Sequence, residues 1–224
     1  MLLYLVKHTR PDIANAVRQL STALDKPNEA AFKEMKQVIK FVINTKHLSL
    51  KFEPKFQGKE EWNMVAYSDS DFAGNIENRQ SIAGFVLYLN RAPISWKSKG
   101  MKLVTLSSSE AEFVSLSKTA KEVSFIYQVM MSMGIELKLP IVIRVDNIGA
   151  IFMSENVAIS NRTKHVDVRY HFVREFVQDG FIKVIFVKSE ENDADLFNKN
   201  LGSELHWKHA NKLLGKEEQV EKID

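Results

Sequence analysis

The hydrophobic pattern of the first fifty residues is mainly helical. Between residues 28 and 43 the apolar positions recur every three or four residues, as at Ala31, Met35, Val38, Ile39 and Val42, which is typical of a helix with one apolar face. Residues 48–52 alternate like a short strand. Because so few elements cannot bury a core of their own, we predict a small helical appendage over residues 1–61, with residues 53–61 as a polar linker.

The pattern changes at Trp62, where short β-like runs separated by turn residues begin. These runs are residues 62–69, 84–89, 93–97 and 101–106, and the last three favour an antiparallel meander. A long helix is predicted from about Ser109 to Met133, followed by a buried strand at 141–147, helices at 148–155 and 166–178, a strand at 181–187 and a helix opening at 191–199. This order predicts an α/β domain with a mixed sheet.

Composition excludes several classes of site. The chain has 224 residues and no cysteine, so it has no disulfide, no thiolate metal ligand and no cysteine nucleophile. No apolar run approaches the ~18 residues of a membrane span, and the apolar start lacks a cleavage site for a signal peptide. We therefore expect an intracellular protein with no membrane partner. The net charge of +3 is compatible with a polyanionic partner without requiring one.

Acidic residues recur where predicted strands end and predicted helices begin. Asp69 and Asp71 follow an apolar run and share strand parity, so they face the same side if the strand continues. Asp146 ends the buried strand at 141–147, where open α/β sheets bind ligands, although it could also belong to a helix cap with Asn147. Asp195 lies in the first turn of a late helix, where the helix dipole alone favours an acid. Each acid alone has an ordinary explanation, but their common location at the end of a strand or the start of a helix indicates a site.

Two further acids stand at the start of the long helix. The predicted core stripe of this helix is Phe113, Leu116, Ala120, Val123, Tyr127 and Met130. Glu112 precedes Leu116 by four positions and so continues that stripe inward, whereas Glu110 lies about 200° away around the helix. Either acid could serve a capping box, with Ser107 or with Ser109. A carboxylate on the buried face is costly without a cationic partner, which makes Glu112 the sharper candidate.

Seven stretches in order resemble one family: "YSDSDFAG", "RQSIAGFVLYL", "PISWKSK", "TLSSSEAEFVSLS", "VDNIGAI", "RTKHVDVRYHFVRE" and "NDADLFNK". Together they resemble the ribonuclease H domain of Ty1/copia-type retrotransposon Pol polyproteins, over residues 62–201. The resemblance implies a ribonuclease H-like mixed five-stranded sheet flanked by helices. The first segment resembles the tail of the upstream reverse transcriptase, without the paired aspartates of the polymerase. Residues 202–224 are then expected to form a C-terminal helix and a frayed tail.

The resemblance also implies a catalytic set and its cofactors. Its Asp-Glu-Asp-Asp series falls on Asp69, Glu112, Asp146 and Asp195, which would hold two Mg²⁺ or Mn²⁺ ions. Asp71 is expected to point away from the set or to lie at its rim, because strand pleating should break after Ser70. The implied reaction is cleavage of the RNA strand of an RNA/DNA hybrid during reverse transcription, leaving a 5′-phosphate and a 3′-hydroxyl. The implied partners are that hybrid and the reverse transcriptase part of the parent polyprotein, in a cytoplasmic virus-like particle or in the nucleus.

Basic residues in three segments are candidates for contacts to the nucleic acid: Arg79, Lys97, Lys99, Arg162, Lys164 and His165. For any one lysine a solvated turn is the more common explanation, and for Arg79 a role in its loop is an equal alternative. Two other functions stay open: a catalytically inactive nucleic-acid-binding or scaffolding module, whose acids only cap helices, and an integrase-like strand transferase. A decayed copy should lose an acid and none is lost, while the early position of Glu112 in its helix argues against the transferase. The loop before Asp195 lacks the histidine that many ribonucleases H carry there.

Overall fold

The computed structural model describes residues 1–56, 61–74, 79–103, 105–156 and 164–216, of which residues 164–170 and 216 are described by their backbone alone. The chain divides into two compact units. One comprises residues 53–199, and the other comprises residues 1–52 together with 200–224. The bounds predicted from the sequence, 1–61, 62–201 and 202–224, differ from this grouping mainly in how the C-terminal residues are assigned, and they stay a prediction.

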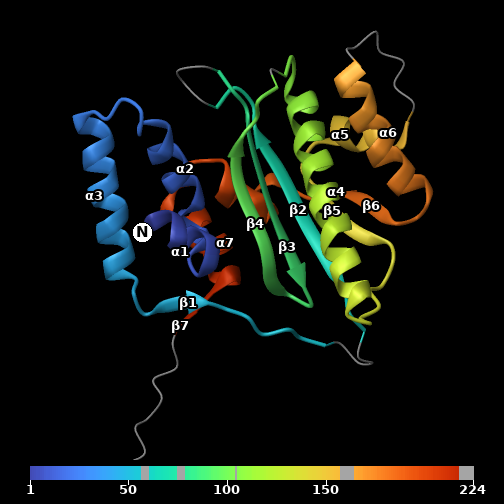
Figure 1. Ribbon diagram of the computed structural model, residues 1–224, viewed down its shortest axis with the longest axis horizontal. Helices are drawn as coiled ribbons and strands as arrows, with labels where there is room; N and C mark the ends of the chain where they lie inside the picture. Colours follow the sequence, from blue (N-terminus) through green and yellow to red (C-terminus); the bar gives the residue numbers. More distant parts are fainter. Residues whose placement is uncertain (57–60, 75–78, 104, 157–163, 217–224) are drawn as a thin grey trace, which may run out of the picture. The chain divides into compact units, whose positions relative to one another are not determined.

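A five-stranded mixed sheet forms the centre of the 53–199 unit (Figure 1). Its order is β4-β3-β2-β5-β6, with β2 at Met64–Asp71, β3 at Ile82–Leu89, β4 at Ala92–Gly100, β5 at Ile141–Val145 and β6 at Ile182–Phe186. The strands β2, β3 and β4 form an antiparallel meander, which thus begins one strand earlier than the predicted meander over residues 84–89, 93–97 and 101–106. The strands β5 and β6 are parallel to β2. The predicted fold class, a mixed five-stranded sheet flanked by helices, is confirmed.

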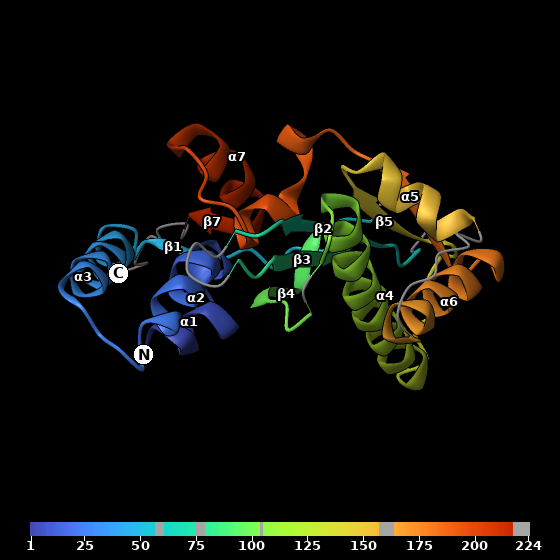
Figure 2. The same cartoon turned by 90° about the horizontal axis from the view of Figure 1, so that it is seen from above.

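Elements on both faces cover β2 and β3. On one face lies α4 (Ser108–Ser132), with α5 (Ile148–Glu155) and α6 (Lys164–Gln178) packed beside it (Figure 2). The other face of β2 and β3 meets the short 3₁₀ helix η3 (Asp193–Phe197). The main core lies between the sheet and α4, and the predicted stripe contributes Phe113, Leu116, Ala120, Val123 and Met130 as buried residues. Tyr127 packs against them half-buried.

Three local predictions in this unit are wrong. The strand β2 does not break after Ser70 but runs through Asp71, because its pairing with β3 continues to Ile82. The strand predicted over 101–106 is absent from its described residues, since β4 already ends at Gly100. The late helix is the five-residue η3 rather than an α-helix, with the side chain of Asn192 accepting a hydrogen bond from the Ala194 N–H as its cap.

The other unit joins the two ends of the chain. Its helices are α1 (Leu2–His8), η1 (Pro11–Ile13), α2 (Ala14–Thr22), α3 (Glu29–Asn44) and α7 (Ser203–Leu213). A two-stranded sheet pairs β1 (Leu48–Leu50) antiparallel with β7 (Leu214–Lys216). The buried ion pair of Arg10 with Asp12, at 2.7 Å, also reaches Thr45 at the end of α3. The N-terminal helices therefore share a unit with the C-terminal helix.

Candidate metal centre

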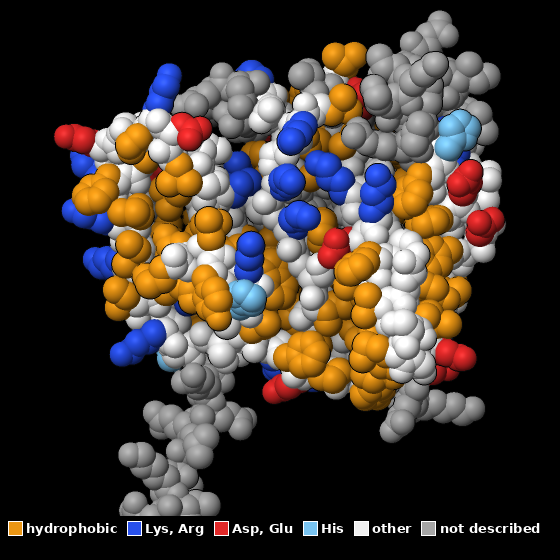
Figure 3. Space-filling view, viewed as in Figure 1, with side chains coloured by type: hydrophobic (Ala, Val, Ile, Leu, Met, Phe, Trp, Pro, Cys, Tyr) orange, Lys and Arg blue, Asp and Glu red, His pale blue; other side chains and the backbone are white. Residues whose placement is uncertain are grey.

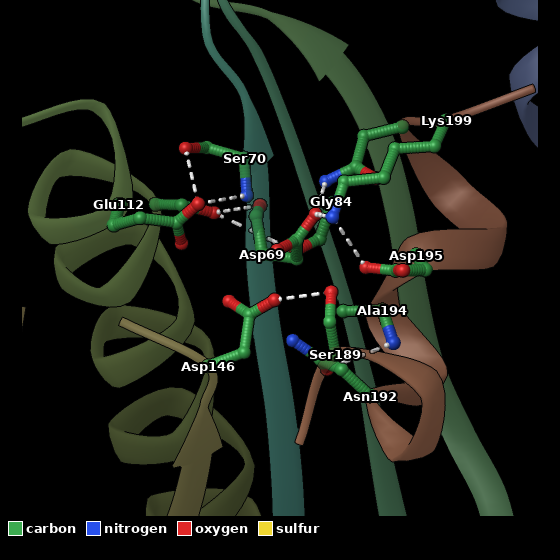
Figure 4. A network of polar contacts seen from close by, with 12 residues as sticks. Asp69, Ser70, Gly84, Glu112, Asp146, Ser189, Asn192, Ala194, Asp195 and Lys199 are labelled. Carbon is green, nitrogen blue, oxygen red and sulfur yellow. Dashed lines mark hydrogen bonds and ion pairs between the residues drawn. The ribbon is translucent and has the colours of Figure 1, made fainter. Parts of the chain in front are cut away.

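Asp69 and Glu112 meet at the end of the sheet from two different elements (Figure 4). Asp69 lies in β2 and is fully buried, and Glu112 lies in the first turns of α4 and is nearly so. The backbone N–H and the hydroxyl of Ser70 both donate to Glu112 Oε1, at 3.1 and 2.9 Å. These bonds fix the carboxylate beside β2 and leave Glu112 Oε2 without a hydrogen-bond partner among the described residues.

Asp146 completes a cluster of three acids. It directly follows β5, and Ser189 Oγ donates to its Oδ2 at 2.7 Å. One carboxylate oxygen from each of Asp69, Glu112 and Asp146 lies within 4.8 Å of the other two. Three oxygens at this separation can ligate one ion, and carboxylates are the ligands that Mg²⁺ and Mn²⁺ prefer. The cluster could therefore hold a metal ion.

Glu110 has a different role at the start of the same helix, although it is also buried. Its N–H donates to Ser107 Oγ at 3.2 Å, and its Oε2 accepts from the Leu106 N–H at 2.8 Å. These are the contacts of a helix cap. Of the two acids near the helix start, only Glu112 joins the cluster.

The fourth predicted acid, Asp195, approaches from the opposite face of the sheet through η3. Asn192 anchors η3 by donating from its side chain to the Ser68 carbonyl at 3.1 Å. Tyr88 on β3 donates to Asp193 at 3.1 Å. Asp195 is not one of the three clustered acids. Lys199 Nζ contacts both Asp195 and Asp69, 2.8 Å from Asp195 Oδ1 and 3.0 Å from Asp69 Oδ2.

The approach of η3 requires a glycine at position 84 of β3. A Cβ there would lie 2.9 Å from both the Ala194 carbonyl oxygen and Phe197 Cβ, closer than atoms pack. We expect Gly84→Ala to lower the free energy of unfolding by about 1–3 kcal/mol through this overpacking. Gly100→Ala is the control, since a Cβ there meets only Gln80 at 3.7 Å. Urea denaturation compares the two, and equal stability would contradict the close approach of η3.

Burial and the charges of neighbouring acids raise the pKa values of Asp69, Glu112 and Asp195. The pKa of Asp69 is raised well above its usual value, first by burial and then by the charges of Glu112 and Asp195. Burial, followed by the charge of Asp146, raises the pKa of Glu112 to about 8. Burial also raises the pKa of Asp195, against the lowering effect of Lys199. A divalent cation would relieve these costs, because it favours the charged form of each carboxyl.

Lys199 remains cationic in this surrounding. Burial alone would lower the pKa of its ammonium, but the charges of Asp69 and Asp195 outweigh burial and raise that pKa above its usual value. Asn198 adds a hydrogen bond of 2.7 Å from Nδ2 to Asp69 Oδ2. The second oxygen of that carboxylate, Asp69 Oδ1, is buried without a hydrogen-bond partner among the described residues.

The predicted nucleic-acid contacts fall into three groups. Lys97 and Lys99 are exposed on β4 and line a pocket of about 400 Å³ between the sheet and α4. Lys102, Lys118 and Lys121 line the same pocket, and Figure 3 shows basic side chains gathered on this face. Arg79 is exposed, in a loop outside this pocket lining. Arg162 and the side chains of Lys164 and His165 lie outside the described part of the chain.

Comparison with known proteins identifies the family. The retrovirus-related Pol polyprotein from transposon RE1 of Arabidopsis thaliana is 34% identical over 205 residues, which is 92% of this chain. The corresponding polyprotein from transposon TNT 1-94 of Nicotiana tabacum is 36% identical over 198 residues, or 88% of this chain. The chain belongs to the retrovirus-related Pol polyproteins of transposons. It spans only 14% of the length of each of these two relatives, and no protein-family model matches it.

This Pol segment also aligns distantly with solved ribonucleases H. LC11-RNase H1, isolated from compost, shares 11% identity at a TM-score of 0.44, with 61% of this chain and 92% of that chain covered. No helix within the described residues of the segment has the length and apolar character needed to cross a membrane.

Three residues of the centre in this Pol segment, Lys199, Asn198 and Ser189, were not predicted from the sequence. Lys199 had a usable signal, because an acid and a lysine four positions apart often pair on a helical turn. Its contact with Asp69 carries no local signal, since the two residues are separated by 130 positions along the sequence and meet only through η3. The hydrogen bond of Ser189 to Asp146 depends on the pairing of β5 with β6, because the two residues follow those two strands.

Proposed function

We propose that the chain is a metal-dependent endonuclease that cleaves the RNA strand of RNA/DNA hybrids during retrotransposon reverse transcription. The convergence of Asp69, Glu112 and Asp146 within 4.8 Å carries this proposal. A fold gathers buried carboxylates against their repulsion only when something compensates them, and a divalent cation does so with hard oxygen ligands. Membership in the transposon Pol polyproteins supports the biological setting, since the proposed substrate is an intermediate of reverse transcription.

Asp69, Glu112 and Asp146 would hold the first ion, and Asp195 is the proposed fourth catalytic residue. Ser70, Asn198 and Ser189 orient the carboxylates, because each donates to one oxygen of an acid. When bound, divalent cations activate a water molecule and stabilise the leaving oxygen in an in-line attack on a phosphodiester. The residues of the chain would position the ions. Their low-dielectric surroundings would strengthen the electrostatic interactions of these charges.

The substrate is proposed to lie along the basic face next to the acids. The lysines around the pocket at β4 and α4 offer phosphate contacts that depend on charge and not on base sequence. Lys99 on β4 pairs with Ala83 on β3, and Ala83 pairs with Ser70 on β2. Lys99 is therefore two strand spacings of ~4.8 Å from Ser70, which donates hydrogen bonds to Glu112. Discrimination of RNA from DNA is proposed to come from contacts to 2′-hydroxyls.

Digestion of an end-labelled RNA/DNA hybrid tests the proposal. We expect Mg²⁺-dependent cleavage of the RNA strand with 5′-phosphate products, and none of duplex DNA or in the presence of a chelator. Asp146→Asn should abolish cleavage and leave thermal stability equal or higher, because one repulsive charge is removed. Asp179→Asn, an exposed aspartate after α6, is the matched control and should cleave normally.

Two results would count against the nuclease. Cleavage by Asp146→Asn at the normal rate would exclude the metal centre as the catalytic site. Binding of the hybrid without any cleavage, by a protein that is folded and loaded with metal, would favour the inactive binding module instead.

A further inference from the structure

Lys199 inserts a positive charge between two of the four acids. Its Nζ lies 2.8 Å from Asp195 Oδ1 and 3.0 Å from Asp69 Oδ2, and it is the last residue before the 53–199 unit ends. The contact is not a surface ion pair, because the Asp69 side chain is 0% exposed and that of Asp195 is 8% exposed. Such buried contacts are little screened by solvent.

The oxygens of Asp69 face two different environments. Oδ2 receives Asn198 Nδ2 at 2.7 Å and Lys199 Nζ at 3.0 Å. Oδ1 is buried and has no hydrogen-bond partner among the described residues, like Glu112 Oε2. A buried carboxylate oxygen without a partner carries a desolvation cost. The two partnerless oxygens are therefore available to a metal ion, whereas Oδ2 already has an amide and an ammonium as partners.

We propose that the Lys199 ammonium occupies the position of a second cation. The site then takes its first divalent ion beside Asp69, Glu112 and Asp146, and admits a second between Asp69 and Asp195 only when Lys199 withdraws. This inference rests on the proposed function, since it concerns the same acidic centre. It assigns to Lys199 the role of a positioning residue that controls how many divalent ions are bound.

The charges and the exposure of Lys199 make this exchange feasible. A single ammonium compensates Asp69 and Asp195 less completely than a divalent ion does, so a second ion can compete when its concentration is high. The Lys199 side chain is 31% exposed, and its flexible four-carbon stem allows the ammonium to move toward solvent. Retraction leaves two carboxylates facing one position, which is an oxygen-only site of the kind that Mg²⁺ and Mn²⁺ bind.

Calorimetric titration with Mn²⁺ tests the proposal without measuring cleavage. For the wild-type chain we expect one ion to bind and a second only at much higher concentration. In Lys199→Met the dissociation constant of the second ion should fall about tenfold or more, because no ammonium competes for the position. The melting temperature of the metal-free variant should fall and be restored by Mn²⁺, since Asp69 and Asp195 then repel each other without compensation.

Two control variants test whether the effect on Mn²⁺ affinity depends on the position of Lys199 and on its charge. Lys183→Met removes an exposed lysine of β6 in the same unit and should leave both Mn²⁺ affinities unchanged. Lys199→Arg keeps the charge and should keep the second site weak. If Lys199→Met strengthens the first and second ions by the same factor, the lysine acts as a diffuse charge and the proposal is overturned.

The remaining outcomes distinguish this inference from the proposed function. If the wild-type chain binds one Mn²⁺ that Asp146→Asn abolishes, but Lys199→Met leaves the second ion weak, the metal centre stands and the role of Lys199 is wrong. If Lys199→Met weakens hybrid binding without changing either Mn²⁺ affinity, Lys199 contacts the nucleic acid and the proposal is wrong. If neither the wild-type chain nor any variant binds Mn²⁺, both the proposed function and this inference fail.

Discussion

Glu112→Gln is expected to lower the rate of hybrid cleavage at least about a hundredfold, because metal-ion stabilisation of transition-state charge is worth several kcal/mol. The substitution keeps an oxygen that can accept from Ser70, so the local structure should survive. What it removes is the negative charge of a carboxylate that belongs to the three-acid cluster and whose Oε2 has no hydrogen-bond partner among the described residues. Single-turnover cleavage of a labelled hybrid in Mg²⁺ measures the loss.

Glu110→Gln is the matched control for this prediction. Glu110 starts the same helix, two positions earlier, and is equally buried, but its Oε2 accepts from the Leu106 N–H and not from the cluster. A glutamine can accept the same bond, so the rate should change by less than about threefold. The assignment of the helix face is wrong if Glu110→Gln is the more damaging of the two, or if the losses are equal.

The metal-free protein is expected to lose stability as the pH rises from about 5 to 8. The pKa of Glu112 is about 8 in the folded chain against 4.5 as its ordinary value, so the folded state binds more protons than the unfolded state across this window. The free energy of unfolding must then fall with increasing pH. The expected slope is on the order of 1 kcal/mol per pH unit near the middle of the window.

Urea denaturation in chelator and in saturating Mg²⁺ measures this dependence. In Mg²⁺ the free energy of unfolding should rise with pH, because the carboxylates must lose their protons to bind the ion and binding stabilises the folded state. Glu112→Gln should flatten the slope in chelator, since it cannot titrate. A free energy of unfolding that rises with pH in chelator would show that the buried acids are not protonated in the metal-free fold.

Local patterns predicted most of the elements that carry the candidate centre. Alternation and β-branched runs predicted β2, β3 and β5, and the three-four spacing of Phe113 and Leu116 predicted which face of α4 is buried. The acids could be ranked because burying a charge is costly. Helix geometry placed Glu112 and Glu110 on different sides of the helix, and the two acids have different partners in the structure.

Features that depend on distant parts of the chain could not be predicted in this way. The continuation of β2 through Asp71 follows from its pairing with Ile82 on β3, and η3 is held by Asn192 and Tyr88 contacts across the sheet. The strand β7 is three residues long and pairs with β1 near the other end of the chain. Lys199 neutralises Asp69 across 130 positions. The spacing of apolar residues near these positions does not predict any of these contacts.

Crystals grown in Mn²⁺ test most directly the central claim that three acids form a divalent-metal centre. Anomalous scattering locates Mn²⁺ independently of how the side chains are fitted. We expect a peak within ligand distance of Asp69, Glu112 and Asp146, bound through Asp69 Oδ1 and Glu112 Oε2, the buried oxygens that the protein leaves without partners. A chain that cleaves hybrids while Mn²⁺ is absent from these three carboxylates, or is found only elsewhere on the protein, would contradict the account.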